Sequence, residues 1–145
     1  MADFTGRVTD APVQGQNYPR TNRDLASAAI TLAGAGAGTT NSDDLYNTSS
    51  RGVRVVCKLT KNSGTIDVVV KIFSKDRATG EYIERLASAS LTASGTTEYI
   101  VHPELTAANN TIAKNFIGEV FKVQVVSGAG SSPNFDATIG VCLLP

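Results

Sequence analysis

Alternation of apolar and polar residues dominates the middle of the chain, from residue 51 to residue 73. Residues 53–59 place Val, Val, Cys and Leu on one face of an extended segment, and residues 66–72 resume the alternation with Ile and Val. The Asn-Ser-Gly at residues 62–64 tolerates positive φ and is typical of a tight turn. This pattern predicts a β-hairpin, which we expect to lie at the centre of the fold.

The same alternation predicts further strands on both sides of this hairpin, at residues 28–32, 82–86, 97–101, 116–126 and 135–143. Residues 75–81 form a charged turn, in which Asp76 can bond to local backbone and Gly80 can adopt the left-handed conformation. Residues 106–115 permit at most one or two helical turns. Because no predicted helix is long enough for a parallel crossover, the sequence predicts an antiparallel β-sandwich or barrel.

The first part of the chain lacks a sustained period. Residues 1–25 carry Pro12 and Pro19 among scattered polar groups, which indicates an irregular arm. Glycines alternate over residues 34–38, but the third glycine of a dinucleotide-binding loop would fall at Thr39, and no lysine occurs before Lys58. A linker is therefore favoured over a nucleotide site. We expect an N-terminal arm and Gly-rich linker at residues 1–42 and a β-sandwich domain at residues 43–145.

Composition limits the partners. The 145 residues are 41% hydrophobic but only 6% aromatic, without Trp, so the core should be aliphatic. Thirteen basic and thirteen acidic residues give a formal charge of zero. No field of one sign attracts nucleic acid or an anionic membrane, so we expect neither as a partner. The first residues have no leader pattern, and we expect synthesis in the cytoplasm.

Candidate chemistry is sparse. Cys57 and Cys142 are expected to be reduced, buried or half-buried thiols rather than a disulfide or a reactive thiol. A zinc site would need more ligands than one histidine and two cysteines provide. That histidine, His102, directly precedes Pro103 and is predicted to be an exposed turn residue rather than a base. We therefore expect no catalytic, cofactor-binding or metal-binding residues, no cofactor and no enzymatic activity.

Residues 42–56, which include Arg-Gly-Val-Arg-Val-Val at 51–56, resemble a recurrent opening in small structural proteins of tailed bacteriophages. Later pieces follow in the same order, at residues 68–72, 75–82, 86–91, 101–106 and 121–125. The match covers roughly residues 42 to 145, with Phe121 where a tryptophan-type residue is expected. The resemblance implies a capsid decoration (cement) protein, which commonly forms trimers and contacts the major capsid protein through an N-terminal arm.

Together these observations predict an all-β protein, an antiparallel β-sandwich of jelly-roll type with an extended N-terminal arm. As the resemblance implies, it would be a homotrimer on the capsid surface of the virion, where its arm would bridge neighbouring major capsid subunits and stabilise the shell. The candidate capsid-binding residues are Phe4, Val8, Val13, Tyr18, Arg20, Arg23, Leu25, Ile30 and Leu32.

Two alternatives stay open. One is a head-fibre, neck or tail component of the same virion. The other is a carbohydrate-binding module on the same scaffold, in which exposed aromatic side chains would form the sugar platform. The available tyrosines are Tyr18, Tyr46, Tyr82 and Tyr99.

Overall fold

The computed structural model describes residues 28–47 and 49–145, which form ten β-strands and no helix. The strands are β1 (Ile30–Ala35), β2 (Gly38–Asn41), β3 (Leu45–Tyr46), β4 (Gly52–Ser63), β5 (Val68–Lys75), β6 (Tyr82–Ala87), β7 (Gly95–Val101), β8 (Ile112–Ala113), β9 (Val120–Ser127) and β10 (Asn134–Leu144). Within this part of the chain, no helix could cross a membrane. The predicted irregular arm at residues 1–25 lies outside the described residues.

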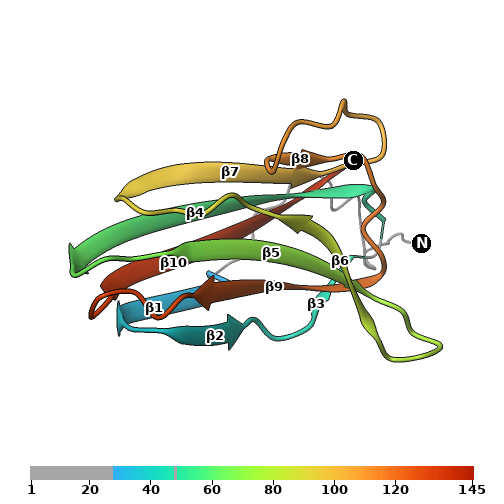
Figure 1. The fold of residues 1–145 in the computed structure, drawn as a ribbon. Helices are drawn as coiled ribbons and strands as arrows, with labels where there is room; N and C mark the ends of the chain where they lie inside the picture. The colour runs from blue at the N-terminus through green and yellow to red at the C-terminus, as the bar shows by residue number, and fades with distance from the viewer. Residues whose placement is uncertain (1–27, 48) are drawn as a thin grey trace, which may run out of the picture.

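The strands form two sheets that share one core (Figure 1). The first sheet has the order β1-β10-β4-β7-β8, and the second has the order β2-β9-β5-β6, with β3 also paired to β9. All pairs are antiparallel except β7 with β8. The nested pairs β1·β10, β2·β9, β4·β7 and β5·β6 roll the chain up from its middle, which is the arrangement of a jelly roll. The predicted fold class is confirmed.

The core is built from the inward face of each long strand. Every second residue of β5 from Val68 to Ser74 is buried, and β9 and β10 show the same alternation. The largest side chains with almost no exposed surface are Phe121 and Phe135, which project from β9 in the second sheet and β10 in the first. The inward residues of β4 are Val53, Val55, Cys57 and Leu59, as the alternation predicted.

The predicted hairpin at residues 51–73 is wrong, although both of its strands exist. β4 pairs with β10 and β7 in the first sheet, whereas β5 pairs with β9 and β6 in the second. The turn after β4 therefore carries the chain from one sheet to the other. Alternation specifies which face of a strand is buried but not which strand lies beside it, and two strands that face each other across a core show the same pattern as a hairpin.

Gly64 occupies the corner between these two strands with φ of +74°. A Cβ at this position would lie 2.0 Å from the main-chain oxygen of Ser132 and 2.5 Å from that of Ser131. The corner is fixed by the Thr65 N–H, which donates to the Ser131 oxygen at 3.0 Å. Glycine is required here both for its backbone conformation and for the close approach of the loop between β9 and β10.

The glycine-rich stretch at residues 34–38 is a second corner between the sheets. β1 pairs with β10 in the first sheet, and β2 pairs with β9 in the second. Ile30 is buried in the core, opposite Ile139. The residues from 28 to 42 thus contribute two strands to the sandwich, so the part of the predicted arm that the structure describes is folded into it. For the residues before 28, the predicted domain division stays a prediction.

Two local predictions have opposite outcomes. The turn at residues 75–81 joins β5 to β6 as expected, with Asp76 Oδ2 accepting the Thr79 N–H at 3.2 Å and Gly80 at φ of +77°. His102 was predicted to be exposed, but only 8% of its surface is accessible. Its Nε2 lies 2.6 Å from the Pro145 oxygen, and its Nδ1 accepts the Glu104 N–H at 3.1 Å. The contact with Pro145, 43 residues away, helps to hold the imidazole inside, and the position of His102 at the end of a strand could not reveal it.

Candidate functional site on the outer face of the second sheet

The predicted capsid-binding residues fall into two groups. Phe4, Val8, Val13, Tyr18, Arg20, Arg23 and Leu25 lie outside the described residues. Of the two in β1, Ile30 is buried and Leu32 is partly buried against the core. Both β1 residues therefore help to anchor this strand to the sandwich.

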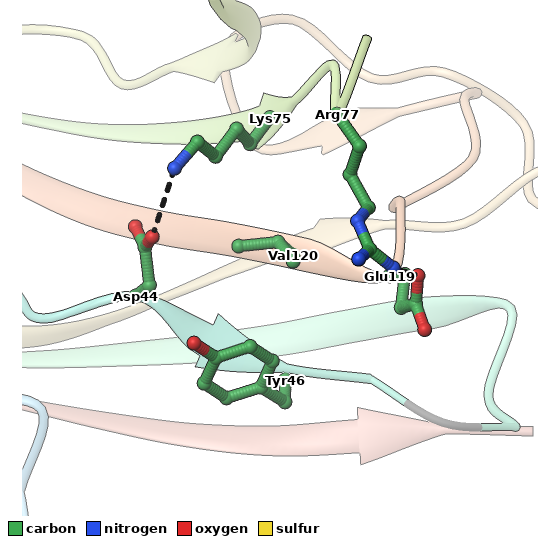
Figure 2. Close-up of a pocket in the computed structure, with 6 residues that line it drawn as sticks. All are labelled: Asp44, Tyr46, Lys75, Arg77, Glu119 and Val120. Carbon is green, nitrogen blue, oxygen red and sulfur yellow. Dashed lines mark hydrogen bonds and ion pairs between the residues drawn. The ribbon is translucent and has the colours of Figure 1, made fainter. Parts of the chain in front are cut away.

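The described chain forms a cleft on the outer face of the second sheet, where β3, β9 and β5 lie side by side (Figure 2). Leu45 of β3 packs toward the core, so its neighbours Asp44 and Tyr46 point outward. The cleft has a volume of about 450 Å³. We call it the Tyr46 cleft, and it is lined by Asp44, Tyr46, Lys75, Arg77, Glu119 and Val120.

Asp44 is the most highly connected group of this cleft. Its Oδ1 accepts the Tyr82 hydroxyl at 2.5 Å, and its Oδ2 lies 3.3 Å from Lys75 Nζ. The Tyr82 hydrogen bond, and then Lys75, lower the pKa of the Asp44 carboxyl. The bond to Asp44 also raises the pKa of Lys75 and that of Tyr82. At neutral pH the carboxylate and the ammonium are therefore both charged, and the phenol keeps its proton.

The remaining charges of the cleft are also paired. Arg77 forms an ion pair with Glu119, and Figure 2 shows the guanidinium extending toward that carboxylate. Beyond the cleft on the same face, Lys122 Nζ lies 4.0 Å from the centre of the Tyr82 ring and 5.5 Å from that of Phe73. These contacts hold Tyr82 between the Lys122 cation and the Asp44 carboxylate, and so they help to fix the position of Asp44.

Tyr46 differs from the other tyrosines in its exposure. Its side chain is 68% exposed, whereas Tyr99 is 2% exposed and Tyr82 is half-buried and hydrogen-bonded. Of the four tyrosines considered as a sugar platform, Tyr46 alone among the described ones presents a free ring; Tyr18 lies outside the described residues. The Tyr46 ring borders the cleft on the side away from Lys75 (Figure 2).

The charged side chains of the cleft balance one another. Asp44 lies opposite Lys75, and Glu119 lies opposite Arg77. The described residues hold no group of three or more His, Cys, Asp or Glu side chains that could bind a metal ion. What the cleft offers a ligand is an aromatic ring beside fixed donors and acceptors.

The two cysteines lie apart from this site, and both are buried and free, as predicted. Cys57 of β4 faces the core, where burial raises the pKa of its thiol to about 11. Cys142 lies on the neighbouring strand β10, out of phase with the inward residues of that strand.

No motif in the sequence connects Asp44 with Lys75 or Tyr82. These partners are 31 and 38 residues further along the chain. The one available signal was parity, because Asp44 and Tyr46 flank an apolar residue and must share a face of an extended segment. Which residues of β5 and β6 lie opposite them depends on the strand order.

No protein-family model matches the chain, and a search of curated proteins gave no match. Among solved structures, it is similar to a protein of Bacillus endospore appendages, which form disulfide-linked pili (13% identity, 93% of this chain and 99% of that chain, TM-score 0.42).

It is also similar to proteins of infectious bursal disease virus, one from the T13 viral particle (14% identity, 92% of this chain and 36% of that chain, TM-score 0.48) and one from the Gt strain (14%, 92% and 38%, TM-score 0.46). The chain therefore spans little more than a third of these viral chains. At such scores, the likenesses identify neither a family nor a function for this chain.

Proposed function

We propose that the chain is a non-enzymatic structural protein of a phage virion, which decorates the capsid and bridges neighbouring major capsid subunits through the residues before its sandwich. The observation that carries this proposal is the position of β1. Among the described strands, β1 pairs with β10 alone and forms one edge of the first sheet. A segment that joins the sandwich at a sheet edge is free to extend onto another subunit. The partner in this proposal, the major capsid protein, is implied by the resemblance of residues 42–145 to phage structural proteins.

Such a segment binds by adding extended backbone to an exposed sheet edge or groove of its partner. Its strength would come from repetition, because each subunit of a trimer supplies one segment and a closed shell presents many equivalent sites. Binding to the assembled lattice, and not to its separated subunits, then stabilises the lattice by mass action.

The anchoring of β1 suits this role. Ile30 is buried opposite Ile139, and Thr31 and Leu32 pair with Thr138 and Ala137. A load on the preceding residues would reach the first sheet through these pairs. The proposed capsid contacts are therefore the seven candidates before residue 28, while we assign Ile30 and Leu32 to holding the strand in place.

The test is a deletion of residues 1–27, which leaves β1 intact. The shortened protein should keep the melting temperature of the full chain but should no longer co-sediment with expanded capsids. Full retention of capsid binding would overturn the role of the segment. Light scattering during size exclusion should give the mass of a trimer for the full chain.

The matched control is Ile30→Ala, which retains the segment and weakens the sandwich. It should melt at a lower temperature yet still bind capsids below that temperature. If neither the full chain nor the variants bind capsids, labelling of intact virions distinguishes the alternative position in a head fibre, neck or tail.

A further inference from the structure

The Tyr46 ring presents a large solvent-exposed aromatic surface. Four large hydrophobic residues of the described chain are exposed, and Tyr46 has the greatest exposed fraction, at 68%. Val120 of the same cleft pairs with Tyr46 and forms its floor. An aromatic face beside an apolar floor gains free energy when a ligand covers it with C–H groups.

The charges around the ring select against ionic ligands. Asp44 is neutralised by Lys75, and Glu119 by Arg77, so the four charged side chains of the cleft sum to zero. A phosphate is favoured by an excess of cationic donors, and a divalent cation by an excess of carboxylate oxygens. In this cleft each cation and each carboxylate already has a partner of the opposite sign.

The same groups are well suited to hydroxyls. A carboxylate has about four lone-pair positions and a guanidinium five N–H donors, so pairing with each other leaves several positions unused. A hydroxyl both donates and accepts, and it can therefore bridge a carboxylate and a neighbouring guanidinium without disturbing their charge balance. The pairs also hold the polar atoms in place, which lowers the ordering cost of binding.

A ligand that presents C–H groups on one face and hydroxyls around its edge satisfies both requirements. The volume of about 450 Å³ lies within the range of small-ligand sites. We propose that the Tyr46 cleft is a binding site for a neutral saccharide, which stacks on Tyr46 and hydrogen-bonds to Asp44, Arg77 and Glu119. This inference goes beyond the capsid role and does not depend on it.

A protein partner fits the cleft less well. Tyrosine and arginine do occur at binding hot spots, but the centre of a protein interface is depleted of charged residues. Four of the six residues that line the Tyr46 cleft are charged, and Arg77 and Glu119 are 68% and 58% exposed. A protein surface that covered them would bury two solvated ions, whereas a saccharide leaves them in contact with hydroxyls.

The experiment is a glycan array with the full chain, followed by saturation-transfer NMR and titration calorimetry with the best neutral oligosaccharide. Tyr46→Ala should weaken its binding about tenfold, because the stacking surface is lost, and Tyr46→Phe should retain it. Phe116→Ala is the matched control, since Phe116 is 63% exposed but does not line the cleft. This variant should bind as the unaltered chain does.

Melting temperatures of all three variants should stay unchanged, because both rings are exposed. The proposal is overturned if no neutral glycan binds in either the array or the NMR experiment. It is equally overturned if only acidic glycans bind, or if Phe116→Ala weakens binding as much as Tyr46→Ala does. Loss of capsid co-sedimentation by Tyr46→Ala, without any glycan binding, would assign the cleft to a protein contact instead.

Discussion

Replacing Gly64 with alanine should destabilise the sandwich far more than an ordinary turn substitution. An L-residue at φ of +74° costs about 1–2 kcal/mol. The added methyl group would also lie 2.0 Å from the Ser132 oxygen, so the loop between β9 and β10 must move away. That displacement costs about 1–3 kcal/mol by analogy with overpacked cores. It also lengthens the 3.0 Å hydrogen bond from the Thr65 N–H to the Ser131 oxygen, worth about 1 kcal/mol.

The expected loss for Gly64→Ala is therefore about 3–6 kcal/mol, a large fraction of the stability of a typical domain. Gly80→Ala provides the matched control. Gly80 has nearly the same φ, +77°, but no atom lies within 4 Å of the position of its missing Cβ. Its substitution should thus cost only the backbone strain, about 1–2 kcal/mol. The difference between the two variants isolates the contact between the corner at Gly64 and the distant loop.

Urea unfolding followed by circular dichroism measures both losses, provided that the dependence of the unfolding free energy on urea is the same for the two variants. Equal losses would refute the reasoning. They would mean that the loop at residues 131–132 does not pack over Gly64, and that residues 62–64 form an isolated turn. A hairpin between the flanking strands, as alternation alone predicts, would then be the better description.

Three further outcomes follow from the packing and the charges. Ile30→Ala should lower the unfolding free energy by about 2–4 kcal/mol in the same urea assay, and the partly buried Leu32→Ala should lower it by less. Because the folded-state pKa of Asp44 is lowered below 3.8, its ionised form adds stability above that pH, and this stability is lost as the pH falls through the folded-state value. The melting temperature of Asp44→Asn should therefore fall less steeply with decreasing pH than that of the unaltered chain. An identical pH dependence of the two melting temperatures in acid would contradict this. In a Cys142→Ser background, Cys57 should not react with a thiol reagent at pH 8 until the protein unfolds, because burial raises its pKa to about 11. Rapid labelling of the folded protein would show instead that the thiol is accessible.

The strands themselves could be predicted because the alternation of apolar and polar residues within each strand shows which of its faces is buried. The alternation around Val123 in β9 and Ile139 in β10 marks one buried face, and the structure buries that face. The turn at Asp76 and Gly80 was also predictable, because its hydrogen bonds join residues a few positions apart. Local information was sufficient wherever the deciding contacts were local.

The partners of the strands could not be predicted in the same way. β4 carries the pattern of a hairpin strand, yet its neighbours are β10 and β7. His102 has no nearby residue that signals burial, and the groups that hold it include the main chain at Pro145, which is 43 residues away. The Tyr46 cleft likewise joins β3 to β5 and β9, so its composition depends on the strand order rather than on any motif. Each of these features is decided by a contact between distant segments.

The roll-up of the chain connects these distant contacts with the proposed function. The pair β5·β6 is closed by a short turn, whereas β1·β10 is the outermost pair, and its Gly34–Asp136 hydrogen bond joins residues 102 positions apart. Closing the longest loop has the highest entropic cost. An edge strand offsets this cost through pairing with only one neighbouring strand. β1 is therefore the strand whose attachment gains most from any further contact. A capsid that bound the residues before β1 would hold this strand against β10, so that binding to the shell and completion of the sandwich would reinforce each other.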